Sequence, residues 1–221
     1  MKAIVVVLTF VLAFVNAEEF CYKDVNRACR PTANKQTIGG IPNCNAKYGA
    51  IDAVLPDLQK YVTNHVTRSF EYLLLSTHYG NYEKNREGFQ KLFKDLSDEK
   101  WESSIELIKY IGKRGGEMDW TQHIKIPETQ YEIYELQSLA KALDIEKDLA
   151  MEAHNIHAEA TRKRKEFHDP EISDHIEHEF VHKQRDNVRK LSGYTADLSK
   201  IMDGPDSSIG LYMFDEYLQK Q

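Results

Sequence analysis

The chain has 221 residues, of which 41% are hydrophobic and 29% are charged, and its formal net charge is −6. A chain of this length forms one sizeable domain that can bury a core without relying on disulfides. The net negative charge argues against nucleic acid as a partner, because such proteins carry basic surfaces. Both signs of charge are interspersed along the chain, which is typical of a solvated helical surface.

Residues 1–17 have the layout of a cleavable signal peptide. A single charge at Lys2 precedes an apolar run over 3–15, and small residues end the segment at Ala17. The run is shorter than the roughly 20 residues that a spanning helix needs, so a membrane anchor is only the alternative. No later segment is apolar enough to span. We therefore expect a secreted protein with no membrane span, whose mature chain begins near Glu18.

All three cysteines, Cys21, Cys29 and Cys44, lie just after this segment. Export places them in an oxidising compartment, where disulfides form. Because three is an odd number, one intrachain bridge leaves a thiol that is free or bonded to another chain. Three buried thiols are the alternative. Pro, Asn, Thr and Gly accompany the cysteines without a helical period, so residues 18–49 are predicted to be an irregular, disulfide-pinned extension.

Residues 50–221 have the periodicity of a helical bundle. Long helices are expected at about 50–82, 86–114, 132–167 and 171–202, with a short helix at about 208–218. The connection between the second and third helices is too long for adjacent antiparallel helices, so we expect it to cross the bundle from end to end. The predicted class is all-α, a four-helix bundle with a long crossover, a short fifth C-terminal helix and an N-terminal cysteine-bearing extension.

The short fifth helix carries apolar residues that are candidates to bury one face. They are Ile209, Leu211, Tyr212, Phe214 and Leu218.

Polar residues interrupt the apolar seams of the long helices. They are His65 and Tyr72 on the first helix, Lys100 and Ser103 on the second, Glu146 on the third and Gln184 on the fourth. Such residues would converge at mid-bundle, where carboxylate-bridged di-iron proteins hold their metals. Because these positions offer a single carboxylate, we expect Lys100 to form a buried ion pair with Glu146 instead. The alternative is that Lys100 extends to the surface.

Two groups of carboxylates could attract cations. On the second helix, steps of three and four residues place five of them on one ridge, namely Asp95, Asp98, Glu99, Glu102 and Glu106. Clustered carboxylates are hard oxygen donors for ferric iron, although a plain solvated face is the alternative. Asp174 and Glu177 lie one turn apart on the fourth helix. In a monomer they are ordinary surface, whereas around a symmetry axis they would form a cation-attracting ring.

From about Ala50 to its end, the chain resembles the ferritins. The resemblance is carried by residues 71–76 (EYLLLS), 89–93 (FQKLF), 113–116 (KRGG), 145–147 (IEK), 169–170 (DP), 174–177 (DHIE) and 210–215 (GLYMFD). The signal peptide and cysteines resemble those of secreted insect ferritins. The resemblance implies an iron-storing 24-subunit cage with a ferric oxyhydroxide mineral core and heavy-chain-like subunits as partners.

Ferritin heavy chains oxidise iron at a centre inside the bundle, and the resemblance places His65, Tyr72, Lys100, Ser103, Glu146 and Gln184 at its positions. Heavy chains have glutamates at the first and third of these positions and a histidine at the fourth. Light chains have a lysine at the Lys100 position, with a salt bridge to Glu146. The resemblance therefore implies a light-chain-like subunit that is not an enzyme. A divergent ferroxidase using Glu146, Gln184 and His65 is the alternative, followed by a monomeric secreted binding protein.

The resemblance also gives the two carboxylate groups a role. Asp95, Asp98, Glu99 and Glu102 match the cavity-facing carboxylates on which light chains nucleate the mineral. Asp174 and Glu177 match the carboxylates of the three-fold channels through which iron enters. About one extra helical turn between Glu146 and Asp169 leaves the placement of His157 beside that channel open. A lone Glu-x-x-His at Glu179 and His182 is expected to be an exposed helical face.

Overall fold

The computed structural model describes residues 21–28, 44–119, 121, 134–162 and 168–221. Contacts divide the chain into two compact units, one up to Ala46 and one from Lys47 onward. The expected signal peptide and Cys29 lie outside the described residues. Every regular element in the described ranges is helical, and none of these helices is both long and apolar enough to cross a membrane.

The first unit contains a short helix and a disulfide. Helix α1 (Cys21–Ala28) begins at Cys21, and the Cys21 and Cys44 sulfurs are bonded to each other. The prediction of an irregular extension is therefore wrong for residues 21–28. These residues contain neither Gly nor Pro, and Asp24 lies in the first turn, where a carboxylate favours a helix. The expected disulfide is confirmed for this pair, which leaves Cys29 as the odd cysteine.

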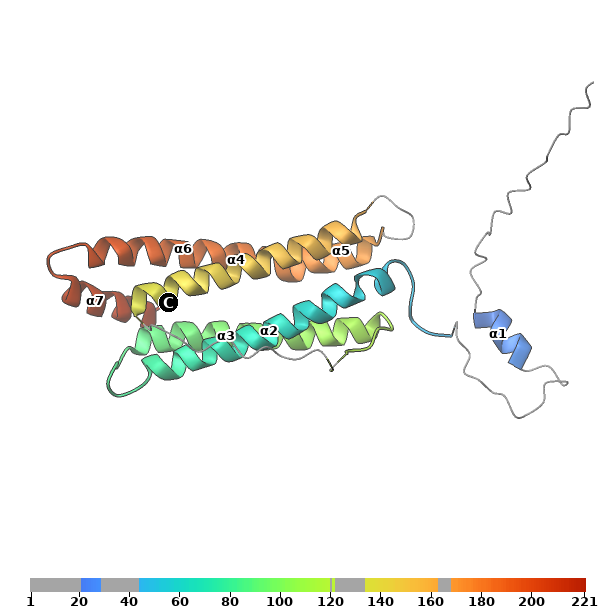
Figure 1. The fold of residues 1–221 in the computed structure, drawn as a ribbon, viewed down its shortest axis with the longest axis horizontal. Helices are drawn as coiled ribbons and strands as arrows, with labels where there is room; N and C mark the ends of the chain where they lie inside the picture. The colour runs from blue at the N-terminus through green and yellow to red at the C-terminus, as the bar shows by residue number, and fades with distance from the viewer. Residues whose placement is uncertain (1–20, 29–43, 120, 122–133, 163–167) are drawn as a thin grey trace, which may run out of the picture. The chain divides into compact units, whose positions relative to one another are not determined.

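The second unit is the expected bundle with its short last helix (Figure 1). Its elements are α2 (Ile51–Tyr79), α3 (Glu87–Lys113), α4 (Glu135–Ala160), α5 (Pro170–Ile176), η1 (Glu177–Val181), α6 (His182–Met202) and α7 (Ser207–Gln219). Because α5, η1 and α6 follow one another without a gap, they form the fourth long helix. The π-helical turn η1 inside it was not predicted from the sequence.

Side-chain contacts at one end of the bundle fix its topology. Tyr79 Oη, at the end of α2, lies 2.7 Å from Ser138 Oγ at the beginning of α4. Arg86, just before α3, lies 3.3 Å from Glu135 at the same end. Helices α3 and α4 therefore run in the same direction, and the chain between them joins opposite ends of the bundle. The long crossover is confirmed.

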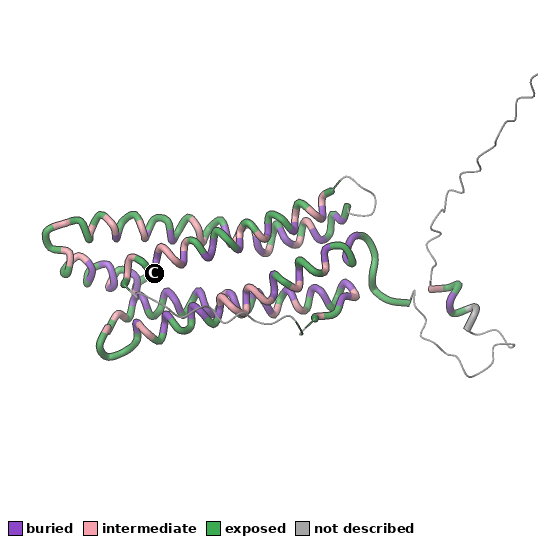
Figure 2. Tube along the Cα trace, viewed as in Figure 1, coloured by how far each residue is buried: buried purple, intermediate pink, exposed green. Residues whose placement is uncertain are grey.

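The buried stripes of the long helices face one another along the bundle axis (Figure 2). The third helix was predicted to reach residue 167, but it ends at Ala160, and Thr161 and Arg162 are not helical. The predicted end rested on Asp169 and Pro170 as the first residues that break the helical pattern, but a helix can end before its breaker. The backbone nitrogen of Asp169 donates to the Ala160 carbonyl at 2.8 Å, which joins the two ends of the α4–α5 connection.

The other end of the bundle is closed by Arg114 and Asp169, both buried. Arg114 Nη2 lies 2.7 Å from Asp169 Oδ2, which also accepts from the Ala50 nitrogen at 3.0 Å. Burial by itself raises the pKa of Asp169, but the Arg114 guanidinium and the backbone donors outweigh it and hold the pKa below its usual value. Gly49 has a φ of +66°, and a Cβ there would come within 2.3 Å of Asp169 Oδ2. This contact requires glycine.

Helix α7 packs on the beginning of α3 with one narrow face. Leu211, Phe214 and Leu218 are buried, as predicted. The prediction is wrong for Ile209 and Tyr212, which are 62% and 57% exposed. Leu211, Phe214 and Leu218 are spaced by three and four residues and therefore share one face of the helix. Ile209 and Tyr212 do not fit this spacing and lie away from that face. In the same contact, Asp215 Oδ1 accepts from the backbone nitrogen of Phe89 at 3.0 Å.

Candidate functional site

Lys100 lies at the middle of α3 with no exposed side-chain surface. Its Nζ is 2.7 Å from Glu146 Oε2 on α4, and Glu146 is also fully buried. The same Nζ lies 3.0 Å from Glu99 Oε1. The predicted ion pair between Lys100 and Glu146 is confirmed, and the alternative that Lys100 extends to the surface is wrong. A buried ammonium and a buried carboxylate are tolerated together because each satisfies the other.

Glu146 is surrounded by hydrogen-bond donors from three other helices. Tyr72 of α2 donates to its Oε1 at 2.7 Å, and Asn187 Nδ2 of α6 donates to its Oε2 at 3.2 Å. Gln184 satisfies both of its neighbours when its amide nitrogen faces Glu146 Oε2, at 2.5 Å, and its oxygen faces Lys100 Nζ, at 3.2 Å. With Lys100 there are four donors, about as many as an ionised carboxyl group accepts.

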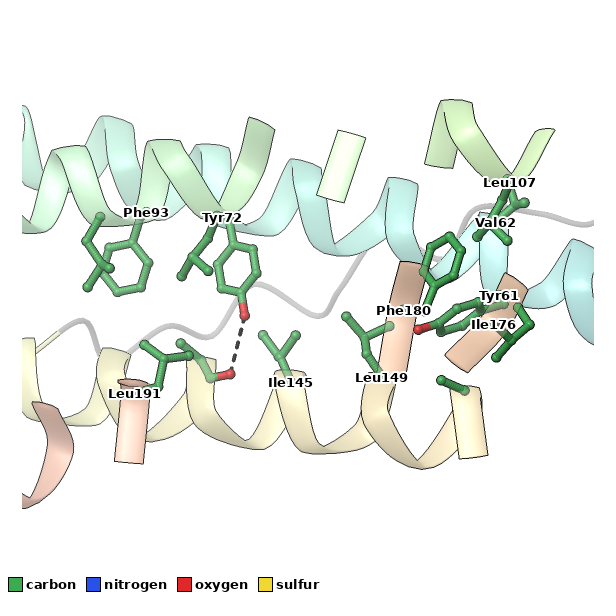
Figure 3. Close-up of a cluster of buried hydrophobic side chains, with 14 of the residues drawn as sticks. Tyr61, Val62, Tyr72, Phe93, Leu107, Ile145, Leu149, Ile176, Phe180 and Leu191 are labelled. Atoms are coloured by element: carbon green, nitrogen blue, oxygen red, sulfur yellow. Dashed lines mark hydrogen bonds between the residues drawn. The ribbon is translucent and has the colours of Figure 1, made fainter. Parts of the chain in front are cut away.

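Tyr72 lies in the core among Phe93, Ile145 and Leu149 (Figure 3), and its hydroxyl donates to Glu146. It is fully buried, and both burial and the nearby Glu146 carboxylate raise the pKa of its hydroxyl. The hydroxyl therefore stays protonated and remains a donor. Ser103, the next polar seam residue of α3 after Lys100, is 4% exposed.

His65 is fully buried, but it is not bonded to Glu146. Its Nδ1 lies 3.0 Å from the Tyr61 carbonyl, which can only accept, so Nδ1 carries the proton. Its Nε2 has no hydrogen-bond partner among the described residues. The ring packs edge-on against Tyr61 and Phe180, with centroids 4.3 and 5.7 Å away. Burial, assisted by the Lys100 charge, lowers the pKa of His65 to about 3, so the ring is neutral.

The π-helical turn η1 supplies Phe180 to this aromatic contact. A π turn contains about one residue more than an α turn, and such turns often occur at functional sites. Phe180 is buried, and its ring centroid lies 5.6 Å from that of Tyr61 (Figure 3). The turn begins at Glu177 and lies between Asp174 and Gln184, so it changes the helical register between these two residues.

The acidic ridge of α3 is not uniform. Asp95, Asp98 and Glu102 are exposed, whereas the side chain of Glu99 is 34% exposed and turned toward Lys100. Several ridge carboxylates have cationic neighbours. Asp98 is ion-paired with Lys94. Glu106 lies 3.4 Å from Lys183 Nζ on α6, and the same nitrogen is 3.4 Å from Glu179.

Asp174 and Glu177 are exposed at the beginning of the fourth long helix, with side-chain exposures of 80% and 54%. His157 Nε2 of α4 lies 3.5 Å from Glu177 Oε2, so the structure places His157 beside this pair. Glu179, of the Glu-x-x-His pattern, contacts Lys183. Within the described ranges, no group of three or more His, Cys, Asp or Glu side chains is arranged to hold a metal ion.

Bundle and polar centre together define a ferritin-like four-helix protein, in which side chains from facing helices meet at mid-bundle. The ferritin-like domain family matches residues 56–201. A crystal structure described as Trichoplusia ni secreted ferritin superposes with a TM-score of 0.83 at 43% identity, covering 92% of this chain and 99% of that one.

Sequence comparison gives the same family. The ferritin light chain of Trichoplusia ni is 43% identical over 232 positions, covering 100% of this chain and 99% of that one. The ferritin light chain of Drosophila melanogaster is 44% identical, with coverages of 95% and 93%. The ferritin heavy chain of Papilio xuthus is 30% identical, with coverages of 73% and 77%. The chain belongs to the ferritin family and is more similar to these insect light chains than to this heavy chain.

The ion pair gives a first prediction. Lys100→Met should destabilise the folded subunit by about 3–5 kcal/mol, because it leaves Glu146 as an unpaired buried charge. Lys100→Met combined with Glu146→Leu removes both charges and should be more stable than the single variant. Guanidinium unfolding of the three proteins measures the difference. A single variant that is as stable as the double variant would contradict this account of the pair.

Stability below neutral pH should depend on His65. Its pKa rises from about 3 in the folded chain to the ordinary value of 6.5 in the unfolded chain. Above pH 6.5 the ring is neutral in both states, so it does not affect the free energy of unfolding. As the pH is lowered from 6.5 to 3, only the unfolded chain binds the proton, and the free energy of unfolding falls by about 1.4 kcal/mol per subunit for each pH unit. His65→Leu should flatten this part of the pH profile of unfolding midpoints. Substituting the exposed His154 with Gln is the control and should not change the profile, and equal slopes for both variants would refute the assignment.

Proposed function

We propose that this chain is a light-chain-like subunit of a secreted ferritin cage, which stores iron without oxidising it. The observation that carries the proposal is the Lys100–Glu146 pair, with Glu146 already accepting from four donors. Ferrous iron approaching this carboxylate would meet a fixed positive charge in a poorly screened interior. The neutral His65 and the buried Ser103 supply no carboxylate to offset it.

Iron reaches the protein as cargo, and the exposed carboxylates are the groups that suit it. Hard oxygen donors favour ferric iron, and Asp95, Asp98 and Glu102 present them together on one helix face. We assign mineral nucleation to these three residues and Glu99. Asp174 and Glu177 would line a symmetry-related channel, and the contact of His157 with Glu177 supports placing His157 at the same opening.

Partners and location follow from the relatives. Insect relatives of this chain include ferritin light and heavy chains, and one structural relative is described as a secreted ferritin. We infer a mixed cage in which heavy-chain-like subunits oxidise iron and this chain supports the mineral. Because Cys21 and Cys44 are bonded to each other, Cys29 is the candidate for a bond between subunits. The apolar segment before Glu18 is consistent with export.

The test of this proposal is a stopped-flow assay of iron(II) oxidation on the purified chain, with native mass measured by light scattering. We expect the chain alone to oxidise iron no faster than buffer, and the chain mixed with a ferritin heavy chain to form a full core. A triple variant, His65→Glu, Lys100→Glu and Ser103→His, should gain at least about tenfold in rate, since it restores the ligand types of heavy chains. Rapid oxidation by the unmodified chain would establish the divergent ferroxidase instead.

The mineral role of the ridge is tested separately with Tb³⁺, a hard cation whose luminescence a nearby tryptophan sensitises. Trp101 lies on the ridge helix and is 53% exposed. Neutralising the ridge with Asp95→Asn, Asp98→Asn, Glu99→Gln and Glu102→Gln should abolish the signal and slow core formation. The control converts four exposed carboxylates elsewhere, Asp57, Asp144, Asp148 and Asp197, to Asn. If this control weakens Tb³⁺ binding equally, net charge rather than the ridge attracts the cation.

A further inference from the structure

Glu99 is the ridge carboxylate that also belongs to the buried centre. Its Oε1 accepts from Lys100 Nζ at 3.0 Å and from Asn187 Nδ2 at 2.8 Å. The side chain is 34% exposed, whereas Asp95, Asp98 and Glu102 are exposed. One of its two carboxylate oxygens, Oε1, is therefore already engaged by one ammonium and one amide.

Asn187 connects the ridge to the centre with a single nitrogen. Its Nδ2 donates to Glu99 Oε1 on α3 at 2.8 Å and to Glu146 Oε2 on α4 at 3.2 Å. An amide nitrogen carries two hydrogens, so it can serve both carboxylates at once. Asn187 lies one turn after Gln184 on α6, and both amides face the same buried carboxylate.

We propose that Asn187 is a positioning residue that holds Glu99 against Lys100 and so keeps this carboxylate away from cations bound on the ridge. The proposal rests on the cation-binding role proposed for the ridge and specifies how Glu99 takes part in it. A cation that draws the Glu99 carboxylate away from the centre must first break its Oε1 contacts with Asn187 and Lys100. Asp95, Asp98 and Glu102 therefore bind the cation first, and Glu99 is a reserve ligand.

The chemistry of the side chain at position 187 fits this role. A neutral amide draws Glu99 inward without adding a second positive charge that would repel the cation. A carboxylate at the same place would repel both Glu99 and Glu146, since like charges close together in a protein destabilise each other. Lys100 alone attracts Glu99, but its Nζ is shared with Glu146 at 2.7 Å. Asn187 supplies the shorter of the two contacts to Glu99 Oε1.

The experiment is a Tb³⁺ titration of the assembled protein, followed by the Trp101-sensitised luminescence. Asn187→Ala should tighten Tb³⁺ binding by about two- to tenfold, the value of one hydrogen bond no longer broken. In a Glu99→Gln background, the same change should have no effect on affinity. Asn64→Ala is the matched control, because Asn64 donates to Glu152 Oε1 at 2.6 Å, on the face between α2 and α4. Trp101→Phe gives the background signal.

The possible outcomes separate this proposal from the function on which it rests. An unchanged or weaker affinity in Asn187→Ala overturns the positioning role, and so does a tightening that persists in the Glu99→Gln background or occurs in Asn64→Ala. The proposed ridge site is judged by a different comparison, between the unmodified protein and the variant with four neutralised ridge carboxylates. If these two bind Tb³⁺ equally, both proposals fail, whereas a difference there with no effect of Asn187→Ala rejects only the positioning role.

Discussion

The buried pair of Lys100 and Glu146 is the constraint on which the rest of the bundle depends. Charges inside a protein are tolerated only when each is paired and hydrogen-bonded. Here the requirement is met by side chains from all four long helices, because Tyr72 comes from α2 and the two amides come from α6. A one-residue shift of any helix would leave a charge or a donor without its partner. The pair therefore selects one register among several that apolar packing alone would permit.

The same pair determines whether the centre of this fold can hold metal ions or is occupied by a side-chain ammonium. A four-helix bundle with carboxylates at this level can hold metal ions. With an ammonium in their place, the centre is filled by the protein's own cation, and the groups left for an external cation are exposed. The ridge of α3 is one such group, although lysines neutralise part of it, as Lys94 does for Asp98 and Lys183 for Glu106. In the proposed function, cations therefore bind at the surface of this chain and not in its core.

The periodicity of the sequence was sufficient to predict the buried ion pair at the core of the site. Lys100 and Glu146 interrupt otherwise apolar seams, and two opposite charges at the same level of a bundle have few partners other than each other. The failures have a common cause in features that local pattern does not encode. The short helix α1 has eight residues, too few for a clear apolar period, α4 ends at Ala160 although neither Gly nor Pro follows directly, and η1 adds a π turn inside a helix that the pattern reads as continuous. Asn187 was missed because a half-exposed asparagine on a polar face has no distinctive pattern.

Glu99 shows why the buried centre and the ridge are not independent sites. Sequence spacing assigns it to the ridge, and its hydrogen bonds assign it to the centre. Lys100 therefore faces two carboxylates with one charge, so the centre carries a net negative charge that Asn187, Gln184 and Tyr72 disperse through hydrogen bonds. Drawing Glu99 outward would leave Lys100 with Glu146 alone, a neutral and self-sufficient pair. Because the core stays satisfied in either position of Glu99, this carboxylate can be released to the surface without opening the bundle.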